Sequence, residues 1–291
     1  MWGNMSKKGA FLLLFLAVFC GDMASAQRYF TTLEAGISVG GSQYFGDLND
    51  HYGFKTINPA GGLYARQRIN AYIAVKASAF YTQVGYDDKY NSDPFEKQRN
   101  LNFKSDIAEV SVQAEFNFFA FVTGDKLHRF TPYLTGGIGA FYYNPYTTYQ
   151  GKTYYLRPLG TEGQDAGQGG RKYSTVSPCF PIGAGVKWWL KGGVNLSFEI
   201  ADRLTTTDYL DDVSSTYVGI NSFKPGSAAA GLQDRSTENN NSPVALGRPG
   251  KQRGNTSSYD QYLMAVVSIS FNFTSYKCPH ANDFDDQLRV H

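Results

Sequence analysis

The sequence has few cysteines, few histidines and little net charge. Its 291 residues include 3 Cys and 4 His, and the formal net charge is +2. The histidines, at positions 51, 128, 280 and 291, lie far apart and do not have the spacing of zinc ligands. No basic patch suggests nucleic acid. We therefore expect no metal or other cofactor and no nucleic-acid partner.

Long hydrophobic runs are also scarce, and the one that is present lies near the N-terminus. Lys7 and Lys8 precede an apolar run over residues 10–19, and Ala24-Ser25-Ala26 follows it. This order predicts a secretory signal peptide, residues 1–26, cleaved after Ala26. Its removal takes away Lys7, Lys8 and Asp22, which leaves a net charge of +1. The mature chain is therefore expected to leave the cytoplasm.

After Ala26 no apolar run approaches the roughly 18 residues that a membrane-spanning helix needs. The mean hydropathy of −0.36 does not separate a soluble domain from a membrane barrel, because only alternate residues of barrel strands face lipid. The 21 Tyr and 21 Phe favour a barrel, where aromatic side chains form girdles at both interfaces. Soluble all-β domains are also rich in aromatic residues.

The clearest pattern runs from Asp106 to Phe121. Apolar residues alternate with polar ones for more than ten positions, so that Val110 and Val112 fall on one face and Glu109 and Glu115 on the other. Strands of soluble sandwiches are usually about 5–6 residues long, whereas a tilted strand that crosses a bilayer needs about 9–11. The length favours a membrane barrel with the apolar face toward lipid.

The same alternation predicts seven further strands. They span approximately residues 32–41, 60–69, 72–85, 130–143, 180–190, 194–200 and 259–274. The joins alternate between short ones, such as Asn70-Ala71 and Lys191-Gly192, and long ones, such as 144–177 and 203–258. Short periplasmic turns and long extracellular loops are typical of outer-membrane barrels.

The fold class is therefore all-β, an eight-stranded antiparallel transmembrane β-barrel with short periplasmic turns and long extracellular loops. We expect the signal peptide at 1–26, the barrel at 27–275 and a periplasmic tail at 276–291, in the outer membrane with both termini periplasmic. Cys179 and Cys278 would then lie at opposite ends of the barrel, and we expect two free thiols.

The polar faces of the strands collect four acids and four bases. Charges in a narrow interior must be paired or solvated, and eight strands leave room for side chains but for no wide channel. We expect a filled interior held by salt bridges, with a path for protons or small ions as the alternative. The predicted network comprises Glu34, Arg66, Lys76, Glu109, Glu115, Lys187, Glu199 and Arg203.

Several stretches go beyond what a barrel requires, and together they resemble the PorG family of outer-membrane proteins. They are Gln43-Tyr44-Phe45-Gly46-Asp47-Leu48-Asn49, Arg99-Asn100-Leu101-Asn102-Phe103, Glu115-Phe116-Asn117-Phe118-Phe119, Phe130-Thr131-Pro132-Tyr133, Phe141-Tyr142-Tyr143-Asn144-Pro145, Arg157-Pro158-Leu159-Gly160-Thr161-Glu162-Gly163-Gln164 and Thr207-Asp208-Tyr209-Leu210-Asp211-Asp212-Val213-Ser214. The tail 276–291 and the Gly/Asn-rich segment 226–256 match no motif of that family.

The resemblance implies a structural role in the type IX secretion system, which exports proteins and in some species supports gliding motility. Its members are understood to connect a periplasmic ring, built from a PorK-type lipoprotein and PorN, to the outer membrane. No catalytic residues are implied, and we expect no enzyme. Ring contact would use the periplasmic side, where the candidate residues are Asp125, Lys126, His128, Arg129, Lys277, Asp283, Asp285, Asp286 and Arg289.

Three alternatives stay open. His51 near Asp208, Asp211 and Asp212 would allow water activation by a hydrolase at the barrel rim. The same three aspartates would suit Ca²⁺, which favours oxygen ligands. A narrow pore or a surface-binding protein would also fit the predicted fold.

Overall fold

The computed structural model describes residues 30–164, 172–238 and 244–276. The chain divides into two compact units, residues 32–273 and residues 1–31 with 274–291, and the fold described below is that of the first unit. The proposed signal peptide and the tail beyond residue 276 lie outside the described residues, so their boundaries stay predictions.

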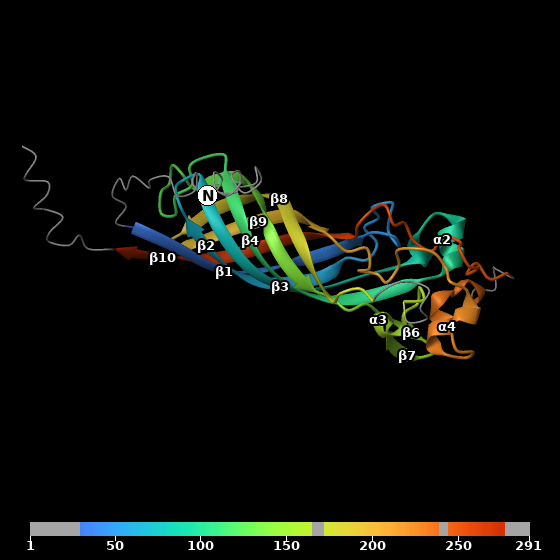
Figure 1. Cartoon of the computed structure of the whole chain (residues 1–291). Helices are drawn as coiled ribbons and strands as arrows, with labels where there is room; N and C mark the ends of the chain where they lie inside the picture. Colours follow the sequence, from blue (N-terminus) through green and yellow to red (C-terminus); the bar gives the residue numbers. More distant parts are fainter. Residues whose placement is uncertain (1–29, 165–171, 239–243, 277–291) are drawn as a thin grey trace, which may run out of the picture. The chain divides into compact units, whose positions relative to one another are not determined.

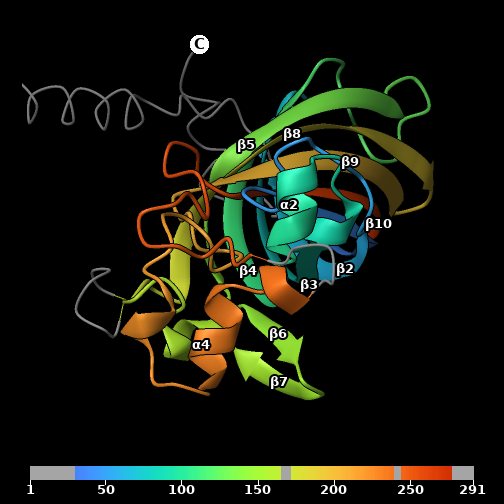
Figure 2. The same ribbon diagram turned by 90° about the vertical axis from the view of Figure 1, so that its right-hand side faces the viewer.

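The barrel predicted from the sequence is confirmed, with eight antiparallel strands in a closed sheet (Figures 1 and 2). The neighbours follow the order β3-β2-β1-β10-β9-β8-β5-β4, and the pairing of β3 with β4 closes the ring. The strands are β1 (Phe30–Phe45), β2 (Asn58–Arg68), β3 (Ile73–Asp87), β4 (Asn102–Asn117), β5 (Phe130–Tyr142), β8 (Val176–Lys191), β9 (Val194–Thr205) and β10 (Gln261–Tyr276). Closure leaves no strand edge exposed to lipid, as a membrane barrel requires.

Several strands extend further toward the long loops than the alternation predicted. β4 begins at Asn102 rather than Asp106, and β1 ends at Phe45 rather than Gly41. In the added part of β4 the outward residues are Asn102 and Lys104, which are polar. Apolar alternation marks only the part of a strand that faces lipid, so it misses an extension beyond the membrane.

Three short connections lie at one end of the barrel, called here the turn end. They join β2 to β3, β4 to β5 and β8 to β9. The long connections lie at the opposite, loop end, and they contain short elements that the sequence did not predict (Figure 1). These are η1 (Asp88–Tyr90), α2 (Pro94–Arg99), β6 (Tyr146–Tyr149), β7 (Lys152–Tyr155), α3 (Leu156–Leu159), η2 (Ile220–Ser222), α4 (Ala228–Gln233) and η3 (Ser236–Glu238).

An apolar band surrounds the barrel on its outer surface. On β4, Val110 and Val112 point outward and are exposed, as predicted. Tyr81 and Tyr142 pair with Ala108 at one limit of this band, and Phe116 marks the other. Eight residue steps along the strand give roughly 26 Å, or roughly 20 Å along the barrel axis at a tilt of about 40°. This height approaches the apolar band of about 25 Å on outer-membrane barrels.

Among the described residues, no helix is long and apolar enough to cross a membrane.

The interior has two layers of different chemistry. Charged and hydroxyl side chains fill the half near the turn end, while aromatic and aliphatic side chains such as Phe103, Ile107 and Phe141 fill the half near the loop end. This apolar layer continues into the loops through Leu48 and Leu210. The sequence predicted the charged layer but not the apolar layer above it.

Candidate functional site

All eight charged residues predicted for the interior are buried there, with exposed fractions of 1–6%. Strand register explains their proximity, since Glu34 lies opposite Arg66 on β2, and Arg66 lies opposite Lys76 on β3. Each ion pair therefore links strands that are neighbours or that face one another across the narrow interior. Alternation alone is sufficient to place such side chains on the inner face.

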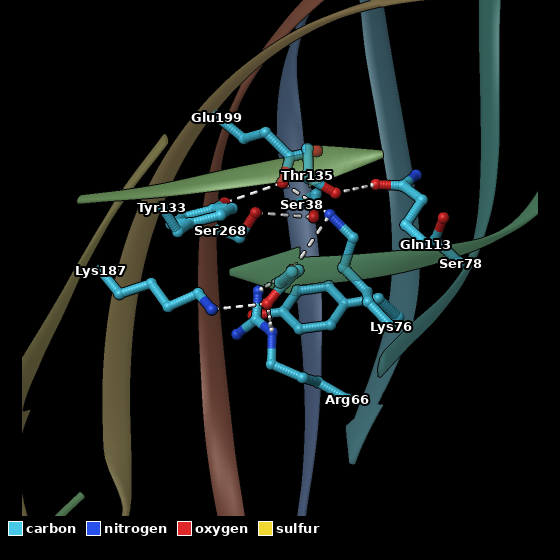
Figure 3. A network of polar contacts seen from close by, with 12 residues as sticks. Ser38, Arg66, Lys76, Ser78, Gln113, Tyr133, Thr135, Lys187, Glu199 and Ser268 are labelled. Carbon is cyan, nitrogen blue, oxygen red and sulfur yellow. Dashed lines mark hydrogen bonds and ion pairs between the residues drawn. The ribbon is translucent and has the colours of Figure 1, made fainter. Parts of the chain in front are cut away.

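Glu115 on β4 is at the centre of the network, and its partners Arg66, Lys76 and Lys187 converge in Figure 3. Its carboxylate lies 2.7 Å from Arg66 Nε, 2.5 Å from Lys187 Nζ and 3.5 Å from Lys76 Nζ. Arg66 also pairs with Glu34, and Lys76 pairs with Glu199 at 2.6 Å. Three acids thus meet three bases in one connected group, whose formal charge is zero.

Arg203 and Glu109 form a separate neutral pair in the same interior. Arg203 Nε lies 3.2 Å from Glu109 Oε2, and the Tyr262 hydroxyl donates to that oxygen at 2.7 Å. Hydroxyl groups also support the main group, because Ser270 donates to Glu34 and Tyr133 donates to Glu199. Buried carboxylates need such additional donors to offset the loss of water.

A glycine allows Tyr133 to reach its partner. A Cβ at Gly185 would lie 2.6 Å from the Tyr133 ring, closer than side chains approach one another. The ring therefore occupies the space above Gly185, and its hydroxyl donates to Glu199. Lys187 Nζ lies 4.2 Å from the centre of the same ring, a distance typical of a cation–π contact.

Little free space separates these charges. The cavities lined by network residues measure about 10 Å³ and 20 Å³. Such a cavity holds about one water molecule. Within the described part of the chain, side chains therefore fill most of the interior around the network.

The loops form a folded cap at the loop end, held by buried ion pairs that sequence reasoning missed. Arg253 Nη1 lies 2.9 Å from Glu162 Oε1 and donates to the carbonyl of Asp212 at 2.7 Å. Arg99 pairs with Asp88 at 2.7 Å and donates to the carbonyl of Arg253. In Figure 2, which looks along the barrel, α2 lies over the ring of strands.

Stretches that carry the resemblance to the PorG family meet in this cap. Glu162 accepts hydrogen bonds from the backbone N–H groups of Ser214 and Ser215, and Thr161 donates to Asp212 at 2.5 Å. Arg99 donates to the carbonyl of Asp47. The stretches 43–49, 99–103, 157–164 and 207–214 thus contact one another, although they lie far apart in the sequence. Residues of these motifs stabilise a common loop structure.

Four aspartates lie at the base of the cap, where Tyr44 joins two of them. The Tyr44 hydroxyl lies 2.6 Å from Asp211 Oδ2 and 3.0 Å from Asp260 Oδ1. Burial, together with the neighbouring carboxylates, raises the pKa of Asp47 and of Asp260. Burial also raises the pKa of Asp211, and it raises that of Asp208 to about 7. Protonated carboxyls are therefore favoured here.

The alternative functions at the rim required His51 to lie near Asp208, Asp211 and Asp212. In the structure these four residues have other partners. Asp208 accepts from Ser214, Asp211 from Tyr44 and the Val213 N–H, and Asp212 from Thr161 and Tyr173. His51 instead contacts Asp50. The three aspartates fasten loops through hydrogen-bond donors, which is unlike both the proposed hydrolase and the proposed Ca²⁺ site.

Three of the four candidate contact residues in the β4–β5 turn make local side-chain contacts. His128 Nδ1 lies 2.6 Å from Asp125 Oδ2, and this contact lowers the pKa of Asp125. Arg129 lies over the Trp188 ring at 5.7 Å. Leu127 at the tip is 89% exposed and flanked by Lys126. The remaining candidates, Lys277, Asp283, Asp285, Asp286 and Arg289, lie outside the described residues.

Cys179 is buried on β8 as a free thiol. Cys278 lies outside the described residues, so its state stays a prediction.

Comparisons with solved structures find other small barrels. The chain is similar to the N-terminal barrel domain of Pseudomonas aeruginosa OprF (11% identity, TM-score 0.36) and to Neisserial surface protein A (11%, 0.38). It is also similar to Ail of Yersinia pestis (10%, 0.38), and each of these three alignments covers 84% of this chain and 98% of the other. No curated protein matches the sequence. Residues 10–230 match the family described as "Domain of unknown function (DUF6089)", and the chain therefore belongs to the DUF6089 family.

Proposed function

We propose that this chain is a sealed outer-membrane barrel with a structural function, neither an enzyme nor an open channel. The observation that carries the proposal is the interior, where eight paired charges leave cavities of only about 10 and 20 Å³. The lipid-facing band supports the location in the outer membrane. Following the rule for such barrels, the turn end and both termini face the periplasm.

The specific role that we propose is to anchor the periplasmic ring of the type IX secretion system, made of a PorK-type lipoprotein and PorN. The support is the resemblance of the loop and strand motifs to the PorG family. Within the described residues, the β4–β5 turn offers a suitable contact, because exposed Leu127 lies among Lys126, His128 and Arg129. An apolar side chain surrounded by charges is common at protein interfaces.

The test is a pull-down of the full-length chain from native outer membranes, with the bound proteins identified. We expect the ring lipoprotein and PorN to be recovered with the wild-type chain. Leu127→Asp should reduce that recovery if the turn makes the contact. Lys191→Glu at the last residue of β8 is the matched control, because it changes an exposed residue at the same end of the barrel.

Deletion of residues 276–291 tests the tail as the second candidate contact. Undiminished recovery after this deletion would count against the tail, and undiminished recovery with Leu127→Asp would count against the turn. Failure to recover ring proteins with the wild-type chain would refute the anchoring role itself. Heat-dependent migration on gels should verify that each variant still forms a barrel.

A surface-binding function is the second candidate, and one observation favours it. The cap contains a polar cleft of about 490 Å³ that opens beside α2. The filled interior disfavours the narrow pore, and planar-bilayer recordings test this point. A stable open conductance of the wild-type chain would contradict the sealed barrel.

A further inference from the structure

Three potential metal ligands from two different loops meet at the loop end. Asp50 and His51 come from the β1–β2 loop and Glu96 from α2, and each offers one ligand atom within 4.8 Å of the others. Asp50 and His51 are exposed, whereas Glu96 is half-buried. Sequence spacing does not reveal the group, because 45 positions separate His51 from Glu96.

The loop that carries Asp50 and His51 has a fixed conformation. Asn49 Nδ2 donates to the carbonyls of Tyr44 and Gly53, at 2.7 and 2.9 Å, and Asn49 Oδ1 accepts from the Gly53 N–H at 2.8 Å. The Asn49 amide therefore closes the loop on both sides of the two ligands. Side chains presented in this way need little rearrangement to bind an ion.

The same loop is fastened to the segment that carries Glu96. Asn91 Nδ2 donates to the carbonyl of Leu48 at 3.0 Å, and Arg99 Nη2 donates to that of Asp47 at 3.0 Å. Arg99 is itself held by Asp88, so the hydrogen bonds connect α2 rigidly to the ligand loop. These hydrogen bonds therefore hold the backbone segments that carry Glu96 and His51 next to each other.

One carboxylate oxygen of Glu96 is available as a ligand. Glu96 Oε2 is buried and has no hydrogen-bond partner among the described residues. Asp93 also lines the cleft that Asp50 and Glu96 line, and so do Arg99 and Arg253.

The cleft gives a cation access to two of these ligands, Asp50 and Glu96. Asp50 and Glu96 line it together with aromatic residues Tyr52, Phe95 and Tyr259, and its volume is about 490 Å³. An ion bound by three side chains would keep at least one coordination position free toward this space. Three protein ligands with one open position are the arrangement of many zinc sites that bind a further molecule.

We propose that Asp50, His51 and Glu96 form a binding site for a divalent transition-metal ion of the Zn²⁺ type. One imidazole with two carboxylates suits such ions better than Ca²⁺ or Mg²⁺, which prefer oxygen ligands alone. A bound metal ion would contact the His51 imidazole and would give the buried Glu96 Oε2 a partner. This site is independent of the proposed anchoring role.

The experiment measures Zn²⁺ binding to the full-length mature barrel in detergent micelles, purified without a histidine tag. His280 and His291 are replaced by Ala, so that His51 and His128 are the two imidazoles left in the chain. Competition with a fluorescent chelator should show one Zn²⁺ per chain. His51→Ala should weaken binding by more than the roughly 10–100-fold that loss of an outer partner of a metal ligand costs.

His128→Ala is the matched control. His128 also contacts an aspartate, Asp125, but it does not belong to the group of three ligands. It should leave the Zn²⁺ affinity unchanged. Glu96→Gln preserves the shape of the side chain and should weaken binding in the same way as His51→Ala. X-ray absorption of the complex should show nitrogen and oxygen neighbours without sulfur.

Equal Zn²⁺ affinity of the wild-type chain and His51→Ala would overturn the proposal. Sulfur in the first coordination shell would also overturn it, because it would locate the ion at a cysteine. Absence of Zn²⁺ binding to the folded wild-type barrel would have the same consequence.

Discussion

The most informative perturbation of the interior is Glu115→Gln. This change retains the shape of the side chain and removes the one carboxylate that three bases share. Glu34 and Glu199 would then face Arg66, Lys76 and Lys187, which leaves one buried positive charge without a partner. Removal of one partner of a buried ion pair costs roughly 3–5 kcal/mol. We expect a loss of this size in the free energy of unfolding.

The assay is urea unfolding of the barrel in lipid vesicles, followed by the fluorescence of Trp188 and Trp189. With a urea dependence of roughly 2–3 kcal/mol per molar, the urea concentration at the midpoint should fall by roughly 1–2.5 M. Ser111→Ala on the same strand is the control, because it removes a buried hydroxyl but no charge. It should cost about 1 kcal/mol.

A second substitution separates charge from packing. Lys187→Gln in the Glu115→Gln background restores a neutral interior, so the double variant should be more stable than the sum of the two single changes indicates. Coupling of this kind between neighbours usually amounts to about 0.5–3 kcal/mol. A Glu115→Gln barrel within about 0.5 kcal/mol of wild type, or strictly additive effects, would refute the reasoning that buried charge balance stabilises this interior.

Three further predictions concern the outer face, the cap and the thiol. Val112→Arg should cost roughly 2–4 kcal/mol in vesicle unfolding because Val112 faces the middle of the apolar band, whereas Leu127→Arg in the exposed turn should change stability little; equal effects would contradict the face assignment. In the folded cap, burial raises the pKa of Asp212 to about 6 and that of Asp208 to about 7, so the protonated forms are stabilised. Their contribution to the stability of the cap is complete below the pKa of an unfolded aspartate, about 4, and is lost as the pH rises through 6–7. Amide exchange at Leu210 and Val213, corrected for intrinsic rates, should therefore show less protection at pH 8 than at pH 5. Greater protection at pH 8 would contradict this direction of the pH dependence. Buried Cys179 should react with maleimide in a Cys278→Ser chain only after unfolding, as mass spectrometry can measure.

The sequence was sufficient to predict the strands and the inward charges because both follow from local alternation. Glu109 and Glu115 lie inward simply because Val110 and Val112 lie outward. The extension of β4 could not be predicted in this way, since its outward residues Asn102 and Lys104 are polar. The extension of β1 could not be predicted either, since residues 42–45 are all buried and do not alternate between an exposed and a buried face. Local pattern therefore determined the membrane part of the barrel and little beyond it.

The cap could not be predicted because its stability depends on contacts between distant residues. Arg253 lies 91 positions from Glu162 and 154 from Arg99, and no periodicity in the sequence connects them. Arg253 also lies in the segment 226–256, which matched no motif. The group of Asp50, His51 and Glu96 was missed for the same reason, since its ligands come together only when two loops fold against each other.

Two layers close this barrel, and they differ in what would open them. Near the turn end, closure depends on charge pairing, and a single substitution such as Glu115→Gln changes stability while leaving the volume of the side chains nearly unchanged. Near the loop end, Phe103, Ile107 and Phe141 close the interior by packing, and the cap covers them. A substitution in the charged layer therefore leaves the apolar layer in place. We expect Glu115→Gln to be less stable than wild type and still closed, so that planar bilayers show no new conductance; a stable conductance from this single change would mean that the charged layer alone seals the barrel.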